Sequence, residues 1–92
     1  MTASDFWTTR AKKAIESGYE PGNPWEDLLR RSVQRCRPKL VEELGDEFAA
    51  YLQVRTADAM RLYDRLIEQG TPEDVAHELA MADLLPVHLD DE

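Results

Sequence analysis

The chain has 92 residues, of which 42% are hydrophobic and 33% are charged, and its formal net charge is −8. A chain of this length builds one small core with little room for an enclosed cavity, which disfavours an enzyme with a deep pocket inside one subunit. The single cysteine, Cys36, excludes an intrachain disulfide and a cysteine-based zinc cluster within one chain. The sequence has neither the apolar segment of a secretory signal nor a stretch near the ~18 apolar residues of a membrane span, so we expect a cytoplasmic protein.

Two helices are predicted in the first 38 residues from their start and stop signals. Ser4 is a plausible N-cap and Gly18 a plausible end for a first helix over 4–17. The loop "GYEPGNP" follows, and Asn23 as N-cap, Pro24 at the first helical position and Glu26 placed as in a capping box predict a second helix that ends before Pro38. The side chains expected to face the core are Trp7, Ala11, Ala14 and Ile15 in the first helix and Trp25, Leu29, Val33 and Cys36 in the second.

A long third helix is predicted from about residue 39 to residue 69. If it is continuous, its length is roughly 46 Å, whereas a globule of this size has a diameter near 30 Å. Either one end of the helix projects toward a partner, or the helix bends at Gly45, where a glycine costs ~1 kcal/mol relative to alanine in a helix interior. Both alternatives stay open at this stage. Its apolar side chains recur at helical spacing and are Leu44, Phe48, Leu52, Ala59, Tyr63 and Ile67.

A fourth helix begins at Thr71 and Pro72 and ends before Pro86. On a helical wheel, Val75, Leu79 and Ala82 lie within about 60° of one another, so we expect this stripe to face the core. The sequence therefore predicts an all-α fold, a small bundle of about four helices built around one long central helix. Residues 1–86 would form a single domain, and residues 87–92 a flexible acidic tail.

The fourth helix has a second apolar side formed by Met81, Leu84 and Leu85. If the stripe faces the core, this side is left exposed, and an exposed apolar patch with an acidic rim is typical of a protein or self-association surface. We therefore predict that these three residues bind a partner protein, together with the acids Glu43 and Glu47 of the long helix.

A metal site is the second interpretation of the fourth helix. Glu73 and Asp74 lie four and three residues before His77, so both carboxylates share its face. A protein metal site takes three or four ligands, and the others would have to come from carboxylates across a dimer. Acids in a first turn also complement the helix dipole, which explains Glu73 and Asp74 without a metal. We predict no bound metal and no cofactor.

The charge is unevenly distributed along the chain. Residues 1–39 carry eight Lys or Arg against five acids, and residues 40–92 carry three Arg against fourteen acids. We expect the arginines of "RRSVQRCR" to pair with the acidic long helix. Direct nucleic-acid binding is disfavoured, because it calls for one basic face in a domain that is basic overall. The acidic half would instead suit a basic protein surface.

Motifs for catalysis are absent from the sequence: it has no Gly-rich phosphate loop, no G-x-S-x-G, no Cys-x-x-Cys and no H-E-x-x-H. We therefore predict a non-catalytic adaptor or regulator that binds another protein and can form a homodimer. Two alternatives stay open. One is an acidic inhibitor whose carboxylates in "VEELGDE" and "TPEDVAHE" mimic nucleic-acid phosphates. The other is the metal-binding helper with a carboxylate and histidine site across a dimer.

Overall fold

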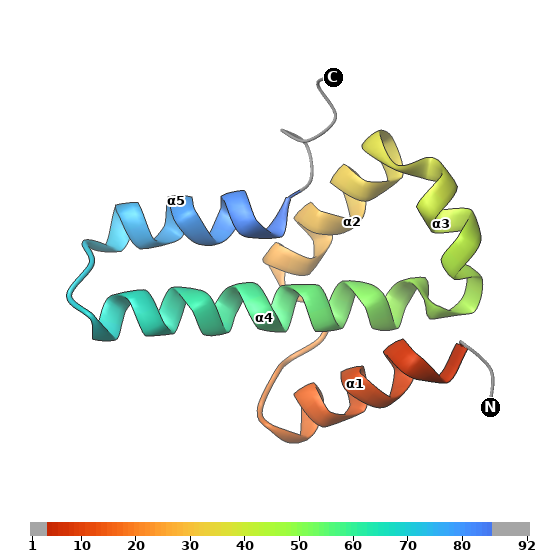
Figure 1. Cartoon of the computed structure of the whole chain (residues 1–92), viewed down its shortest axis with the longest axis horizontal. Coiled ribbons are helices and arrows are strands. Elements are labelled where there is room, and N and C mark those ends of the chain that lie inside the picture. The colour runs from red at the N-terminus through yellow and green to blue at the C-terminus, as the bar shows by residue number, and fades with distance from the viewer. Residues whose placement is uncertain (1–3, 86–92) are drawn as a thin grey trace.

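The computed structural model describes residues 4–85, with side chains from residue 6 onward, and it is all-α, as predicted. The elements are α1 (Ser4–Glu16), α2 (Pro24–Cys36), α3 (Pro38–Leu44), the 3-10 turn η1 (Gly45–Glu47), α4 (Phe48–Glu68) and α5 (Glu73–Leu84). Helix α4 runs through the middle of the molecule, with α1 along one side and α5 along the other (Figure 1). The predicted cap by the Ser4 side chain and the predicted tail 87–92 lie outside the described residues.

The long helical segment from residue 38 to residue 68 bends at Gly45. The φ of 54° and ψ of −121° at Gly45 lie in a region of backbone conformation that residues with a Cβ adopt only with strain. Helix α3 therefore turns away from the axis of α4 (Figure 1). The bend, and not a projecting rod, is the correct alternative. It leaves α4 with 21 residues, about 32 Å, inside a molecule that measures 41 × 36 × 20 Å.

Helix α2 follows the sequence prediction closely. The Asn23 side chain accepts a hydrogen bond from the Glu26 backbone N–H at 3.0 Å, and Pro24 occupies the first turn. Leu29 and Val33 are each 1% exposed, and Trp25 packs against them from the rim. The core cluster consists of Leu29, Val33, Leu52, Ala59 and Leu84.

Helix α1 packs on α4 and η1 through small residues. Ala11 and Ala14 are buried, and the Trp7 ring meets the Tyr51 ring edge to face at 4.9 Å between centroids. The prediction is wrong for Ile15, which is 43% exposed. Two alanines bring α1 close to α4 over a narrow strip, and Ile15 lies beyond the edge of that strip.

Near the end of α4, the prediction also fails for Ile67, which is 39% exposed. In the middle of the helix more positions are buried than the stripe predicts, because α1 packs on one side of α4 and α5 on another. The additional buried residues are Val54, Thr56 and Ala57.

Helix α5 presents a different face to the core from the one predicted. Ala76 and Ala80 are completely buried, whereas Val75 is 40% exposed and Leu79 is 48% exposed. Ala82 is exposed as well, so the predicted core stripe is wrong. Apolar residues occur on several sides of α5, and two alanines four residues apart allow a closer approach to α4 than larger aliphatic side chains would.

Candidate interaction surface

The carboxylate and histidine group of α5 takes part in helix packing. The exposed His77 ring meets the Trp25 ring of α2 edge to face at 5.6 Å between centroids. The Tyr63 hydroxyl of α4 donates a hydrogen bond to the Glu73 carboxylate at 3.3 Å. Desolvation, and next the charge of Glu73, raise the pKa of Tyr63. Asp74 is exposed, and no group of three or more His, Cys, Asp or Glu within residues 4–85 is placed to hold a metal ion.

The predicted apolar docking patch is wrong, because its residues belong to the core. Leu84 is completely buried in the same cluster as Leu29 and Leu52. Met81 and Leu85 are partly buried and pack against that cluster. The physical reason is the rotation of α5: once Ala76 and Ala80 face α4, the side that carries Leu84 turns inward.

The C-terminal end of α5 is held by Arg55 of α4. Its guanidinium donates hydrogen bonds to the carbonyl oxygens of Asp83 at 3.0 Å and Leu84 at 3.3 Å. These carbonyls belong to the last turn of a helix, where partners within the helix are missing and positive charge is favourable. Arg55 thus fixes both the position and the rotation of α5.

The two predicted partner-binding acids have different environments. Glu43 is exposed on α3. Glu47 is only 5% exposed, and its carboxylate accepts hydrogen bonds from the Thr8 backbone N–H at 3.0 Å and the Thr8 hydroxyl at 2.8 Å. The prediction is therefore wrong for Glu47, which attaches α1 to η1 and is not available to a partner.

Two arginines of the predicted basic cluster, Arg30 and Arg31, pair within helix α2. Arg30 contacts Asp27 at 2.7 Å and Glu26 at 3.7 Å, and Arg31 contacts Asp27 at 2.9 Å. Every ion pair among the described residues joins side chains three or four positions apart. The expected pairing of this cluster with the acidic long helix is not found in the described part of the chain. Exposed local pairs contribute little to stability.

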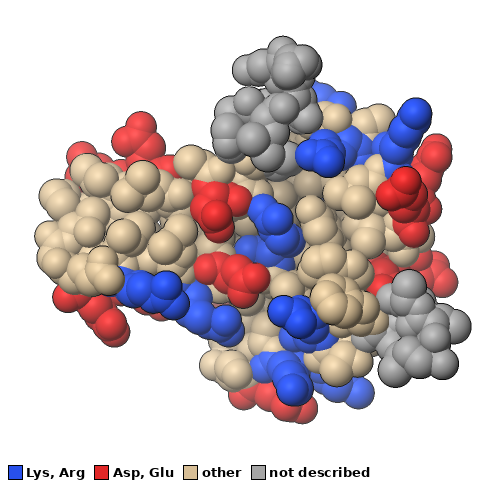
Figure 2. Space-filling view, in the orientation of Figure 1, with Lys and Arg blue, Asp and Glu red and all other residues tan. Residues whose placement is uncertain are grey.

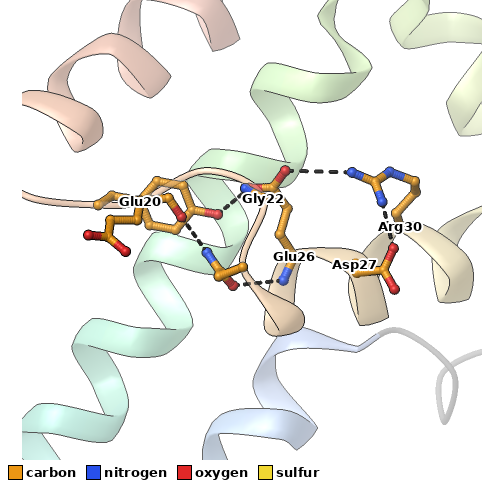
Figure 3. Close-up of polar contacts among 7 residues, drawn as sticks. Glu20, Gly22, Glu26, Asp27 and Arg30 are labelled. Atoms are coloured by element: carbon orange, nitrogen blue, oxygen red, sulfur yellow. Dashed lines mark hydrogen bonds and ion pairs between the residues drawn. The ribbon is translucent and has the colours of Figure 1, made fainter.

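A buried carboxylate that the sequence did not reveal lies at the start of α2. Glu26 is 4% exposed, accepts a hydrogen bond from the Gly22 backbone N–H at 3.2 Å, and also accepts one from the Tyr19 hydroxyl (Figure 3). Burial, followed by the bond to Glu26, raises the pKa of Tyr19. Glu26 and Asn23, whose amide donates to the Glu20 carbonyl at 2.7 Å, together fix the loop between α1 and α2. The capping-box spacing correctly placed Glu26 near the cap, but it gave no sign of Tyr19.

The exposed apolar surface of α5 is formed by the residues that were expected in the core. We call Val75, Leu79 and Ala82 the outer stripe, and the exposed acids Asp74 and Glu78 lie beside it. Figure 2 shows a broad uncharged area over the α4–α5 end of the molecule, with acidic side chains at its upper and lower margins and both basic and acidic side chains along α4.

No protein-family model, curated protein or solved structure matches the chain. Within the described residues, none of the helices combines the length and the apolar character needed to cross a membrane. The arrangement of the chain's own residues is therefore the basis for the function proposed below.

Proposed function

We propose that the protein is a non-catalytic adaptor or regulator that acts by binding another protein through the outer stripe. The observation that carries this proposal is the exposure of Val75 and Leu79, 40% and 48%, on one face of a regular helix. Complete burial of an aliphatic side chain contributes about 1.5–3 kcal/mol, so covering two half-exposed ones is a substantial part of the energy of a modest interface. Because a helix already fixes their positions, little conformational freedom is lost on binding.

The shape of the molecule agrees better with a binding role than with catalysis. Its shortest dimension is 20 Å, about two helix diameters, so the chain is a thin plate with wide faces. Glu73 and His77 are the side chains best suited to catalysis or metal binding. They contact Tyr63 and Trp25, respectively, and thereby help to pack α5. We place this activity in the cytoplasm, where a free thiol such as that of Cys36 stays reduced.

The two alternative functions receive less support. A phosphate mimic needs a continuous acidic surface, and on the face shown in Figure 2 basic side chains lie among the acidic ones over α4. A metal site across a dimer would need Glu73 and His77 to give up their contacts with Tyr63 and Trp25.

Photo-crosslinking in cells tests the proposal. A photoreactive amino acid replaces Val75 in the full chain, and in a control it replaces Arg31, which is exposed on α2. We expect a discrete crosslinked protein product from position 75 that is absent from position 31. If position 75 gives no product above the control, the outer stripe is not a protein-binding surface and the proposal is wrong.

A further inference from the structure

The outer stripe has the spacing of a seam between two paired helices. Val75, Leu79 and Ala82 are separated by four and then by three residues, and this alternation brings the apolar side chains of paired helices together. All three residues are exposed, on the side of α5 opposite the completely buried Leu84. Since α5 packs mainly on α4, no helix of the described residues covers this side. A helix of a partner can therefore lie along the outer stripe.

Acidic side chains flank the outer stripe on both sides. At about 100° per residue, Glu78 lies about 40° beyond Ala82 on one side, and Asp83 lies about 40° beyond Leu79 on the other. Both acids are exposed. In a pair of helices these are the two positions beside the apolar seam, where the charge of one helix meets the charge of its partner and sets the choice of partner.

The charge around the outer stripe is net negative. Helix α5 carries four acids and neither Lys nor Arg. The neighbouring part of α4 is mixed, and its Arg61 already pairs with Asp58 at 3.5 Å. Arg55, which reaches α5, donates to the backbone carbonyls of the last turn. Residues 58–84 contain seven acids and two Lys or Arg, a balance of −5. This surface therefore attracts a basic partner.

We propose that the outer stripe binds a basic amphipathic helix of another protein, with apolar residues at alternating spacings of three and four and Lys or Arg on both flanks. This inference rests on the proposed function, namely that the outer stripe is a protein-binding surface. The apolar side chains of the partner cover Val75 and Leu79, which supplies affinity. Its basic side chains approach Glu78 and Asp83, which speeds the encounter and selects the partner.

Like charges disfavour a second copy of α5 as the occupant. In a parallel pair of α5 helices, Glu78 of one copy meets Asp83 of the other, and in an antiparallel pair each acid meets its own equivalent. Acids face acids in both arrangements, so self-pairing through the outer stripe is selected against. The net charge of −8 adds repulsion between copies at long range.

Two synthetic helical peptides test the proposal in a fluorescence-anisotropy titration with the full chain. Both carry leucine at the seam positions, and the flanking positions are lysine in one and glutamate in the other. We expect the lysine peptide to bind at least about tenfold more tightly than the glutamate peptide. Leu79→Gln should weaken its binding about tenfold, because the apolar contact is lost, and Val75→Gln is a second variant in case the first perturbs folding.

Leu28→Gln is the matched control for these variants, because Leu28 is 43% exposed but lies on α2. It should bind the lysine peptide like wild type, and circular dichroism should show that all variants stay helical. If Leu79→Gln and Val75→Gln bind the lysine peptide as tightly as wild type, the outer stripe is not the binding site and the proposal is wrong.

Charge exchange tests the role of the flanking acids. The double variant Glu78→Lys with Asp83→Lys should reverse the preference and bind the glutamate peptide about tenfold more tightly than the lysine peptide. The control is Glu42→Lys with Glu43→Lys, which makes the same change in net charge at two exposed acids of α3. It should keep the preference for the lysine peptide. Equal reversal in both double variants would attribute the preference to net charge and overturn the inference.

The outcomes separate this inference from the proposed function. If position 75 crosslinks to another protein in cells, but the chain binds both peptides equally or neither of them, the basic helix is overturned and the binding surface is kept. The absence of both a crosslink and peptide binding overturns both. A crosslink from position 75 to a second copy of the chain would also overturn the inference.

Discussion

Replacement of Tyr19 by phenylalanine should destabilise the fold through a single hydrogen bond. The Tyr19 hydroxyl donates to the Glu26 carboxylate, which is 4% exposed and also accepts from the Gly22 N–H. The phenylalanine ring retains the packing and removes only the donor. A hydrogen bond to a charged group contributes about 1.5–3 kcal/mol, and because Tyr19 is partly exposed we expect the lower part of that range, a loss of about 1.5–2 kcal/mol in the free energy of unfolding.

The same hydrogen bond predicts a specific pH dependence. Burial, together with Glu26, raises the pKa of Tyr19 in the folded chain, whereas an unfolded tyrosine has a pKa of about 10. A raised folded pKa stabilises the fold fully below the unfolded pKa, and this stabilisation is lost as the pH rises toward the folded pKa. The difference in stability between wild type and Tyr19→Phe should therefore be constant up to about pH 9 and shrink above about pH 10. Tyr63, whose pKa is also raised, is present in both proteins and cancels in the difference.

Urea unfolding followed by circular dichroism measures both effects. The matched control is Tyr51→Phe, because the Tyr51 hydroxyl makes no hydrogen bond within the described residues while its ring packs on Trp7. This control should lose less than about 0.5 kcal/mol. Two outcomes would refute the role assigned to the Tyr19–Glu26 contact. One is an equal loss of unfolding free energy in Tyr19→Phe and Tyr51→Phe. The other is a stability difference between wild type and Tyr19→Phe that grows above about pH 10.

Five further substitutions test the remaining contacts by urea unfolding. Leu84→Ala should lower the free energy of unfolding by about 2–5 kcal/mol, because Leu84 is completely buried. Leu79→Ala should lower it by less than about 1 kcal/mol, because Leu79 is 48% exposed. A larger loss for Leu79→Ala than for Leu84→Ala would contradict the observed rotation of α5. Arg55→Ala should lower the free energy of unfolding by about 1–2 kcal/mol and speed amide hydrogen exchange in the last turn of α5. Exchange at the wild-type rate would argue against the capping contact of Arg55. Glu47→Ala should lose about 1–3 kcal/mol since it removes the acceptor for Thr8, and no loss would mean that α1 docks without it. Gly45→Ala should lose about 1–3 kcal/mol because of its positive φ, and unchanged stability would show that the bend does not need a glycine.

Local signals in the sequence were sufficient for the helices themselves. Asn23 and Pro24 marked the start of α2, and the spacing of Leu29 and Val33 marked its buried face, because all of this information lies within one helix. Gly45 was recognised as a potential bend, but glycine is also tolerated in a continuous helix. The choice depends on packing of α3 against its neighbours, which the local sequence does not encode.

Contacts between distant segments account for the predictions that failed. Glu47 was assigned to the surface because charged side chains are rarely buried, yet it accepts hydrogen bonds from Thr8, 39 positions away. For α5, hydrophobic periodicity could not identify the core face, because Val75 and Leu79 form as regular a stripe as Ala76 and Ala80. Side-chain volume determined which face of α5 packs on α4, since the small alanine side chains permit the closest approach of the two helices.

The rotation of α5 separates residues that hold the fold together from residues available for binding. Ala76, Ala80 and Leu84 are completely buried, and Arg55 holds the end of the helix against α4. The outer stripe therefore adds little to the stability of a single chain, and two large aliphatic side chains in this position increase the exposed apolar surface without strengthening the core. Substitutions in the outer stripe should change association while leaving the unfolding free energy nearly constant, and substitutions at Ala76, Ala80 or Leu84 should do the reverse. The proposed binding function accounts for this arrangement, because the outer stripe can vary in sequence without changing the core.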